Sequence, residues 1–191
     1  MKVMSQPKNN NKNLKTEIIP LKERKIDIAL LFFYWINILF ITYIIDIEQN
    51  IIKDPSNFDY PLWPPKFAVD IIHWYGYNYD PVLIARPMWW KMTIWIDSIF
   101  FGPFYILAIY AYTKGKEWIR VPSFLWASSI MTNVLIILGE EIWGEYPTPK
   151  LGIVLLLNFP WLFFPGLTIY RMWKAEEGRA FCREQEEETP A

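Results

Sequence analysis

Two acids set against long apolar runs are the residues of this chain most able to do chemistry. Asp46 ends an apolar stretch that begins at Ile26, and Asp97 interrupts the stretch from Met92 through Tyr112. A carboxylate inside a membrane helix costs about 2.5–3.5 kcal/mol even on lenient insertion scales, so it usually faces a partner, water or a ligand. We therefore predict a functional pair. The alternative is one interfacial carboxylate and one structural hydrogen bond between helices.

Four apolar runs must position these acids, and they cover about residues 26–46, 92–113, 121–141 and 151–173. A bilayer-spanning helix needs about 20 mostly apolar residues. None of the runs alternates as a strand does, so helices are expected. The fold class predicted is an all-α membrane protein, a four-transmembrane-helix bundle, with a soluble helical bundle as the alternative.

Lysine and arginine near the ends of the runs predict the orientation of the bundle. Lys22, Arg24 and Lys25 precede the first run, and the connection over residues 114–120 is basic. The connection over residues 139–149 is acidic. Both termini are therefore expected in the cytoplasm.

The remaining composition excludes several classes of site. Cys182 is the single cysteine and His73 the single histidine, which removes an intramolecular disulfide and the common zinc sites. No metal and no cofactor are expected, and a net charge of −1 gives no argument for nucleic acid. We predict disordered tails over residues 1–22 and 175–191, where few apolar residues are available for a core, and one transmembrane domain over residues 23–174.

Polar residues from different runs are predicted to lie in the same half of the bilayer. With a rise of 1.5 Å per residue, Asp97, Asn133 and Asn158 lie roughly 8, 12 and 10 Å inside the non-cytoplasmic face, and Asp46 lies near that face. This layer favours a cavity, although asparagine also joins membrane helices through structural hydrogen bonds. Pro103, Pro160 and Pro165 are expected to bend their helices and leave room for it.

The long first connection, about residues 47–91, resembles a cover more than a loop. Asp80-Pro81 is typical of a helix N-cap followed by proline at the first helical position. We expect an amphipathic helical connection over the non-cytoplasmic mouth of the bundle. The helical spacing that supports it is carried by Phe67, Ile71, Ile72 and Tyr75.

An ordered series of short motifs resembles the EXPERA-domain family, which includes the sigma-two receptor and a sterol Δ8–Δ7 isomerase. The resemblance covers about residues 26–173 and is greater to the receptor branch. The motifs are Asp46-Ile47-Glu48, His73-Trp74-Tyr75, Asp80-Pro81-Val82-Leu83, Lys114-Gly115, Trp118-Ile119-Arg120, Pro122 and Met131-Thr132.

The resemblance implies a binding site. Asp46 would be the carboxylate that faces the ligand, and Asp97, where the receptor has glutamate, would be its hydrogen-bonding partner. It further implies a homodimer and, in a eukaryote, the endoplasmic reticulum. Thr42 stands where the isomerase has a histidine. The other pocket-lining residues implied are Tyr75, Phe101, Asn133, Leu157 and Trp161.

Three functional hypotheses follow. In the first, the cavity binds a sterol-like or other apolar molecule, cationic or neutral, beside a carboxyl pair that shares one proton. In the second, Asp46 and Asp97 are the catalytic acid and base of a sterol or terpenoid double-bond isomerase that acts through a carbocation. In the third, the bundle is a dry structural scaffold with no saturable ligand.

Overall fold

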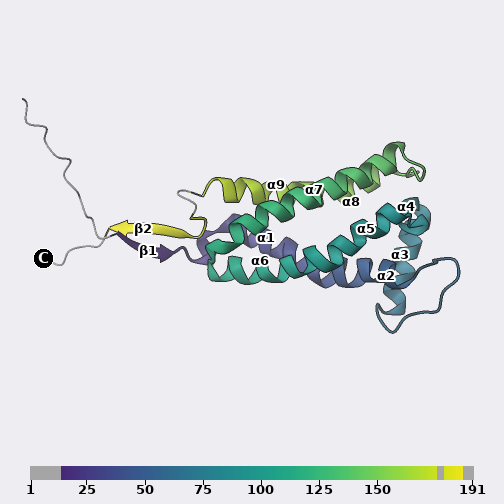
Figure 1. Ribbon diagram of the computed structural model, residues 1–191, viewed down its shortest axis with the longest axis horizontal. Coiled ribbons are helices and arrows are strands. Elements are labelled where there is room, and N and C mark those ends of the chain that lie inside the picture. Colours follow the sequence, from purple (N-terminus) through teal and green to yellow (C-terminus); the bar gives the residue numbers. More distant parts are fainter. Residues whose placement is uncertain (1–13, 176–178, 187–191) are drawn as a thin grey trace, which may run out of the picture.

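The computed structural model describes residues 14–175 and 179–186, and within them four long helical segments run side by side (Figure 1). They extend over Lys25–Ile51, Met88–Lys114, Glu117–Trp143 and Leu151–Trp173, and each is long and apolar enough to cross a membrane. The predicted class, a four-helix membrane bundle, is confirmed.

The first two spans each contain a π-helical stretch, and each acid lies at the edge of one. The first span comprises α1 (Lys25–Ile36), a π-helix (Asn37–Asp46) and α2 (Ile47–Ile51). The second comprises α5 (Met88–Ile96), a π-helix (Asp97–Phe101) and α6 (Gly102–Lys114). Pro103, which has no N–H, follows the second stretch and helps to explain it. Widened turns of this kind are frequent at functional sites.

The last two spans differ in how regular they are. The third joins a 3₁₀ turn (Glu117–Ile119) to α7 (Arg120–Trp143), which is continuous. The fourth divides into α8 (Leu151–Asn158) and α9 (Pro160–Trp173), with Pro160 at the start of α9 and Pro165 inside it. The division falls where the sequence places Pro160, because proline cannot donate to the preceding turn.

An aromatic core fills the half of the bundle nearest the chain termini. The ring of Tyr34 meets those of Tyr112 and Trp126 edge-on, each at 5.5 Å between centroids. Trp126 also stacks on Phe104 at 4.8 Å. Helix α1 packs against α6 and α9, and α7 packs along α9. This half is therefore closed, which leaves the other half for the cavity.

The first connection forms the predicted amphipathic cover. It contains a loop over residues 52–65 followed by α3 (Lys66–Asn78) and α4 (Pro81–Ala85), at the end of the bundle opposite the strands (Figure 1). Asp80 caps α4, where its Oδ1 accepts a hydrogen bond from the Leu83 N–H at 3.1 Å. The apolar stripe does not all point inward: Ile72 is buried, whereas Phe67 and Ile71 are exposed on the outer face.

The described parts of the two tails form a small sheet where the sequence favoured disorder. Strands β1 (Leu14–Ile18) and β2 (Cys182–Glu186) pair antiparallel, with Ile18 opposite Cys182. The carboxylate of Glu117 accepts the N–H groups of Ala180 and Phe181, each at 2.6 Å, and Phe181 is fully buried. These contacts anchor the segment before β2. Residues 1–13, 176–178 and 187–191 of the predicted disordered tails lie outside the described residues.

Candidate functional site

A cavity of about 430 Å³ lies between the four spans and the cover. Its size is within the range of roughly 300–1,000 Å³ typical of small-molecule sites. All seven residues singled out from the sequence line it, together with Asn158, although they come from four spans and the cover. The seven are Asp46, Tyr75, Asp97, Phe101, Asn133, Leu157 and Trp161.

The structure brings the two acids together. The carboxyl groups of Asp46 and Asp97 are in hydrogen-bonding contact with each other. Thr42 donates its hydroxyl to Asp97 Oδ1 at 2.7 Å. Asp46 is 4% exposed, and its Oδ2 receives no hydrogen bond from an N–H or hydroxyl donor among the described residues. Asp46 therefore has acceptor capacity that the protein itself does not use.

A glycine allows the first two spans to approach at the level of the acid pair. A Cβ atom placed on Gly102 would lie 2.9 Å from Cγ2 of Thr42 and 3.2 Å from the hydroxyl of Tyr43. Such contacts are too close for an ordinary side chain. Gly102 therefore keeps Thr42 within reach of Asp97.

The electrostatics of the pair follow from its burial and contact. Two carboxylates a few Å apart in a low-dielectric site repel each other strongly when both are ionised, so one proton is held between them. The protonated carboxyl can then donate a hydrogen bond while the ionised one accepts. Such a pair can bind an amine or a hydroxyl group, and it can also exchange a proton with a substrate.

The rest of the lining is mostly apolar, with a few oriented polar groups. The indole N–H of Trp161 donates to Asn37 Oδ1 at 2.9 Å, which fixes that ring at the cavity wall. The indole N–H of Trp90 donates to Gln49 Oε1 at 2.6 Å. Asn158, which the sequence placed in the polar layer, donates to the carbonyl of Val154 at 3.0 Å.

Sequence reasoning missed five polar or aromatic residues of the lining: Gln49, Trp74, Asp80, Trp90 and Thr93. Gln49 could have been found, because it follows Asp46 by three positions and shares its helix face. Trp90 is buried, although nothing in its local sequence indicates this. Asp80 was noted only as a helix cap.

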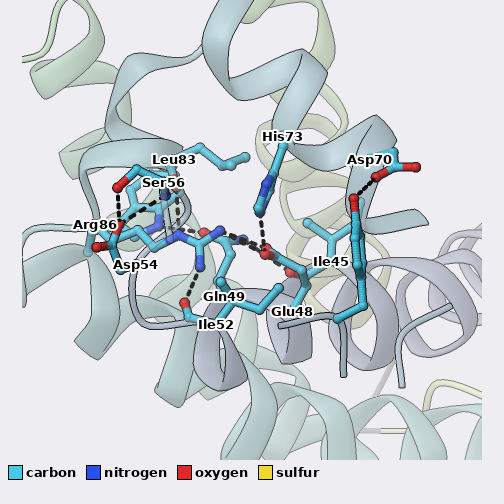
Figure 2. Close-up of polar contacts among 12 residues, drawn as sticks. Ile45, Glu48, Gln49, Ile52, Asp54, Ser56, Asp70, His73, Leu83 and Arg86 are labelled. Carbon is cyan, nitrogen blue, oxygen red and sulfur yellow. Dashed lines mark hydrogen bonds and ion pairs between the residues drawn. The ribbon is translucent and has the colours of Figure 1, made fainter. Parts of the chain in front are cut away.

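A buried polar cluster fastens the cover to the end of the first span (Figure 2). Arg86 Nη2 donates to both carboxylate oxygens of Glu48, at 2.9 and 2.8 Å. The guanidinium also binds the carbonyls of Leu83 and Ile52. His73 Nε2 lies 2.8 Å from Glu48 Oε1. No motif or spacing in the sequence indicates that these distant residues meet.

Two groups at the cover have perturbed acidity. Burial raises the pKa of Asp80 above its ordinary value. Burial, followed by the nearby carboxyl groups of Asp80 and Glu141, raises the pKa of the Tyr75 hydroxyl. Both groups therefore lose their protons less readily than the same groups do in water. Within the described residues, no three His, Cys, Asp or Glu side chains are grouped as metal ligands would be.

Comparison with known proteins identifies the family. The family model described as EXPERA (expanded EBP superfamily) matches residues 67–172, which is more than half of the chain. The chain belongs to the EXPERA family. The resemblance inferred from the motifs is thereby confirmed.

Relatives within the family include receptors. The chain is 29% identical to sigma intracellular receptor 2 of Xenopus tropicalis over 152 residues, which is 74% of this chain and 84% of the relative. It is 28% identical to the proteins of the same name from Macaca fascicularis and Homo sapiens over 119 residues, which is 61% of this chain and 63% of each relative.

Proposed function

We propose that this EXPERA-family membrane protein binds a sterol-like or other apolar ligand, including one that carries an amine, within the cavity. Asp46 faces the ligand and Asp97 is its hydrogen-bonding partner. The observation that carries the proposal is the unused acceptor oxygen of Asp46 in a largely apolar cavity. A buried polar group without a partner costs free energy, and a ligand donor would satisfy it.

The shape of the site supports a ligand that comes from the membrane. Among the lining residues, Ile71, Trp74 and Leu157 are also exposed on the outside of the protein. They belong to the cover and to α8, so the cavity opens to the outside of the protein between these elements. In a bilayer this surface faces lipid, which suits a role in sterol or lipid handling.

Equilibrium binding tests this function. Purified protein in detergent is loaded with a radiolabelled sterol, which is displaced by an amphiphilic amine. Asp46→Asn removes the charge and keeps the shape, and we expect amine affinity to fall by about 10- to 100-fold, as for loss of a charge-assisted hydrogen bond. Asp59→Asn makes the same change at an exposed position of the connection and serves as the control. Unchanged amine affinity in Asp46→Asn would overturn the assignment.

The acid pair also supports a second candidate, a sterol or terpenoid double-bond isomerase. A proton held between Asp46 and Asp97 could be given to an alkene, and the faces of Tyr75 and Trp161 could stabilise the resulting cation by about 1–2 kcal/mol. Thr42 in place of the isomerase's histidine counts against that enzyme's mechanism. Incubation with a Δ8-sterol distinguishes the two. Conversion that is lost in both Asp46→Asn and Asp97→Asn would establish the enzyme, and binding without conversion supports the receptor-like function.

The proposal extends to the setting of the protein. We place both termini in the cytoplasm, the protein in the endoplasmic reticulum of a eukaryotic source, and two copies in a homodimer, with residues 23–174 as the membrane domain. The basic residues flanking the first span support the orientation. An N-glycosylation acceptor inserted at residue 57 should be modified, whereas one in the tails should not. Cross-linking in membranes tests the dimer.

A further inference from the structure

The cover carries an exposed apolar surface on the side turned away from the bundle. Leu62, Phe67, Ile71 and Trp74 are each more than half exposed, and Leu62 is 101% exposed. Trp63, which is 50% exposed, completes this outer apolar surface. The stretch over residues 60–65 adds no charged side chain to it. Large apolar side chains grouped in this way mark an interaction surface.

Helix α3 has three different faces. One face is buried against the bundle. Phe67, Ile71 and Trp74 follow one another by four and three positions and form an exposed apolar face beside it. Lys66 and Asp70 form an exposed polar edge, where an ion pair of 2.8 Å joins them. A helix with an apolar face and a charged edge is suited to lie in the plane of a membrane interface.

The loop before α3 reaches back along the first span. The indole N–H of Trp63 donates to the carbonyl of Tyr43 at 2.7 Å. Tyr43 precedes Ile51, the last residue of the span, by eight positions, which is about 12 Å along the helix axis. The ring of Trp63 therefore lies beside the span rather than beyond its end. Its N–H has the acceptor that an indole needs in an apolar environment.

The outer apolar surface continues the lipid-facing surface of that span. Leu39, Phe40 and Tyr43 are exposed on the first span, which is long and apolar enough to cross a membrane. Trp63 binds the backbone of Tyr43, so the exposed surface of the cover begins next to that of the span. The lipid that surrounds the span is therefore in place to contact the cover as well.

We propose that the cover is inserted into the membrane, with its outer apolar surface docked in the lipid leaflet at this end of the bundle. The acyl chains contact Leu62, Phe67 and Ile71, while Lys66 and Asp70 remain among headgroups and water. The cover thus lies within the leaflet instead of standing above the bilayer. This inference depends on the fold and not on which ligand the cavity binds.

Site-directed spin labelling of the full chain in phosphatidylcholine vesicles tests the inference. Cys182→Ser removes the single cysteine, and one exposed residue at a time is then replaced by cysteine and labelled. Collisions of the label with oxygen, which concentrates in lipid, are compared with collisions with a water-soluble nickel chelate. Phe40→Cys, on the first span, provides the lipid reference, and Asn57→Cys, at an exposed position of the loop, provides the water reference.

We expect the ratio of oxygen to nickel accessibility at Leu62→Cys and Phe67→Cys to match that at Phe40→Cys. A scan of residues 66–74 should give oxygen maxima at positions 67, 71 and 74. The nickel maxima should fall one position earlier, at 66 and 70, which is a rotation of about 100° around the helix axis. An unchanged melting temperature shows that each labelled protein is folded.

Two results would overturn the inference. Ratios at Leu62→Cys and Phe67→Cys equal to that at Asn57→Cys would place the cover in water, above the bilayer. Low accessibility to both reagents would show that protein, such as a second copy of this chain, covers the surface in place of lipid.

Discussion

The buried ion pair between Glu48 and Arg86 should be a large contributor to the stability of the cover. Arg86 is 3% exposed and Glu48 is fully buried, and two hydrogen bonds of 2.9 and 2.8 Å join them. Glu48→Gln keeps the shape but leaves the guanidinium as a buried cation without a counter-charge. Removing one partner of a buried pair costs about 3–5 kcal/mol. At about 2–4 °C per kcal/mol for a chain of this size, the melting temperature should fall by roughly 6–20 °C.

The assay is thermal unfolding in detergent micelles, with hydrogen exchange to locate the change. Exchange should rise in α3 and α4, which the cluster fastens, and less in α7. The double variant Glu48→Gln/Arg86→Met removes both charges, and it should recover more than half of the lost stability. Asp70→Asn removes the exposed ion pair with Lys66 and alters the exposed hydrogen bond that the Tyr60 hydroxyl donates to Asp70, and it should change the melting temperature little. A Glu48→Gln protein with the same melting temperature as the unaltered protein would refute the reasoning.

Three further outcomes are expected. Gly102→Ala should push Thr42 from Asp97, lower the unfolding free energy by about 1–3 kcal/mol and weaken amine binding, as measured by unfolding and by titration. Because the folded protein raises the pKa of Asp80, the contribution of this residue to stability is complete below its unfolded pKa of about 3.8 and is lost as pH rises through the folded pKa. The dependence of the melting temperature on pH should therefore be weaker in Asp80→Asn. Phe181→Ala should cost about 3–5 kcal/mol and release the segment before β2, seen as faster exchange there, and an unchanged rate would contradict the anchoring.

The spans and the acid pair could be predicted because they depend on local pattern. Membrane helices require about 20 apolar residues, and helical rise places Asp97 and Asn133 at similar depths. The capping role of Asp80 was equally local. These features need no knowledge of which segments meet.

What could not be predicted depends on contacts between distant segments. Glu48 and Arg86 are separated by 38 positions, and Asp80 and Glu141 by 61, so no spacing rule joins them. The π-helical turns could not be predicted either, because apart from Pro103 no residue type in these stretches indicates a π-helix. Anchoring of the segment before β2 depends on Glu117, which the sequence presents only as one more charged loop residue.

Photoaffinity mapping with a diazirine-bearing sterol tests the central claim, ligand binding in the cavity, most directly. Membranes containing the protein are irradiated, and labelled peptides are located by mass spectrometry. We expect competable labelling of cavity residues such as Ile45, Phe101 and Trp161, reduced in Asp46→Asn when an amine-bearing probe is used. Labelling confined to outward-facing residues such as Phe32 and Phe40, insensitive to competitor, would contradict the account.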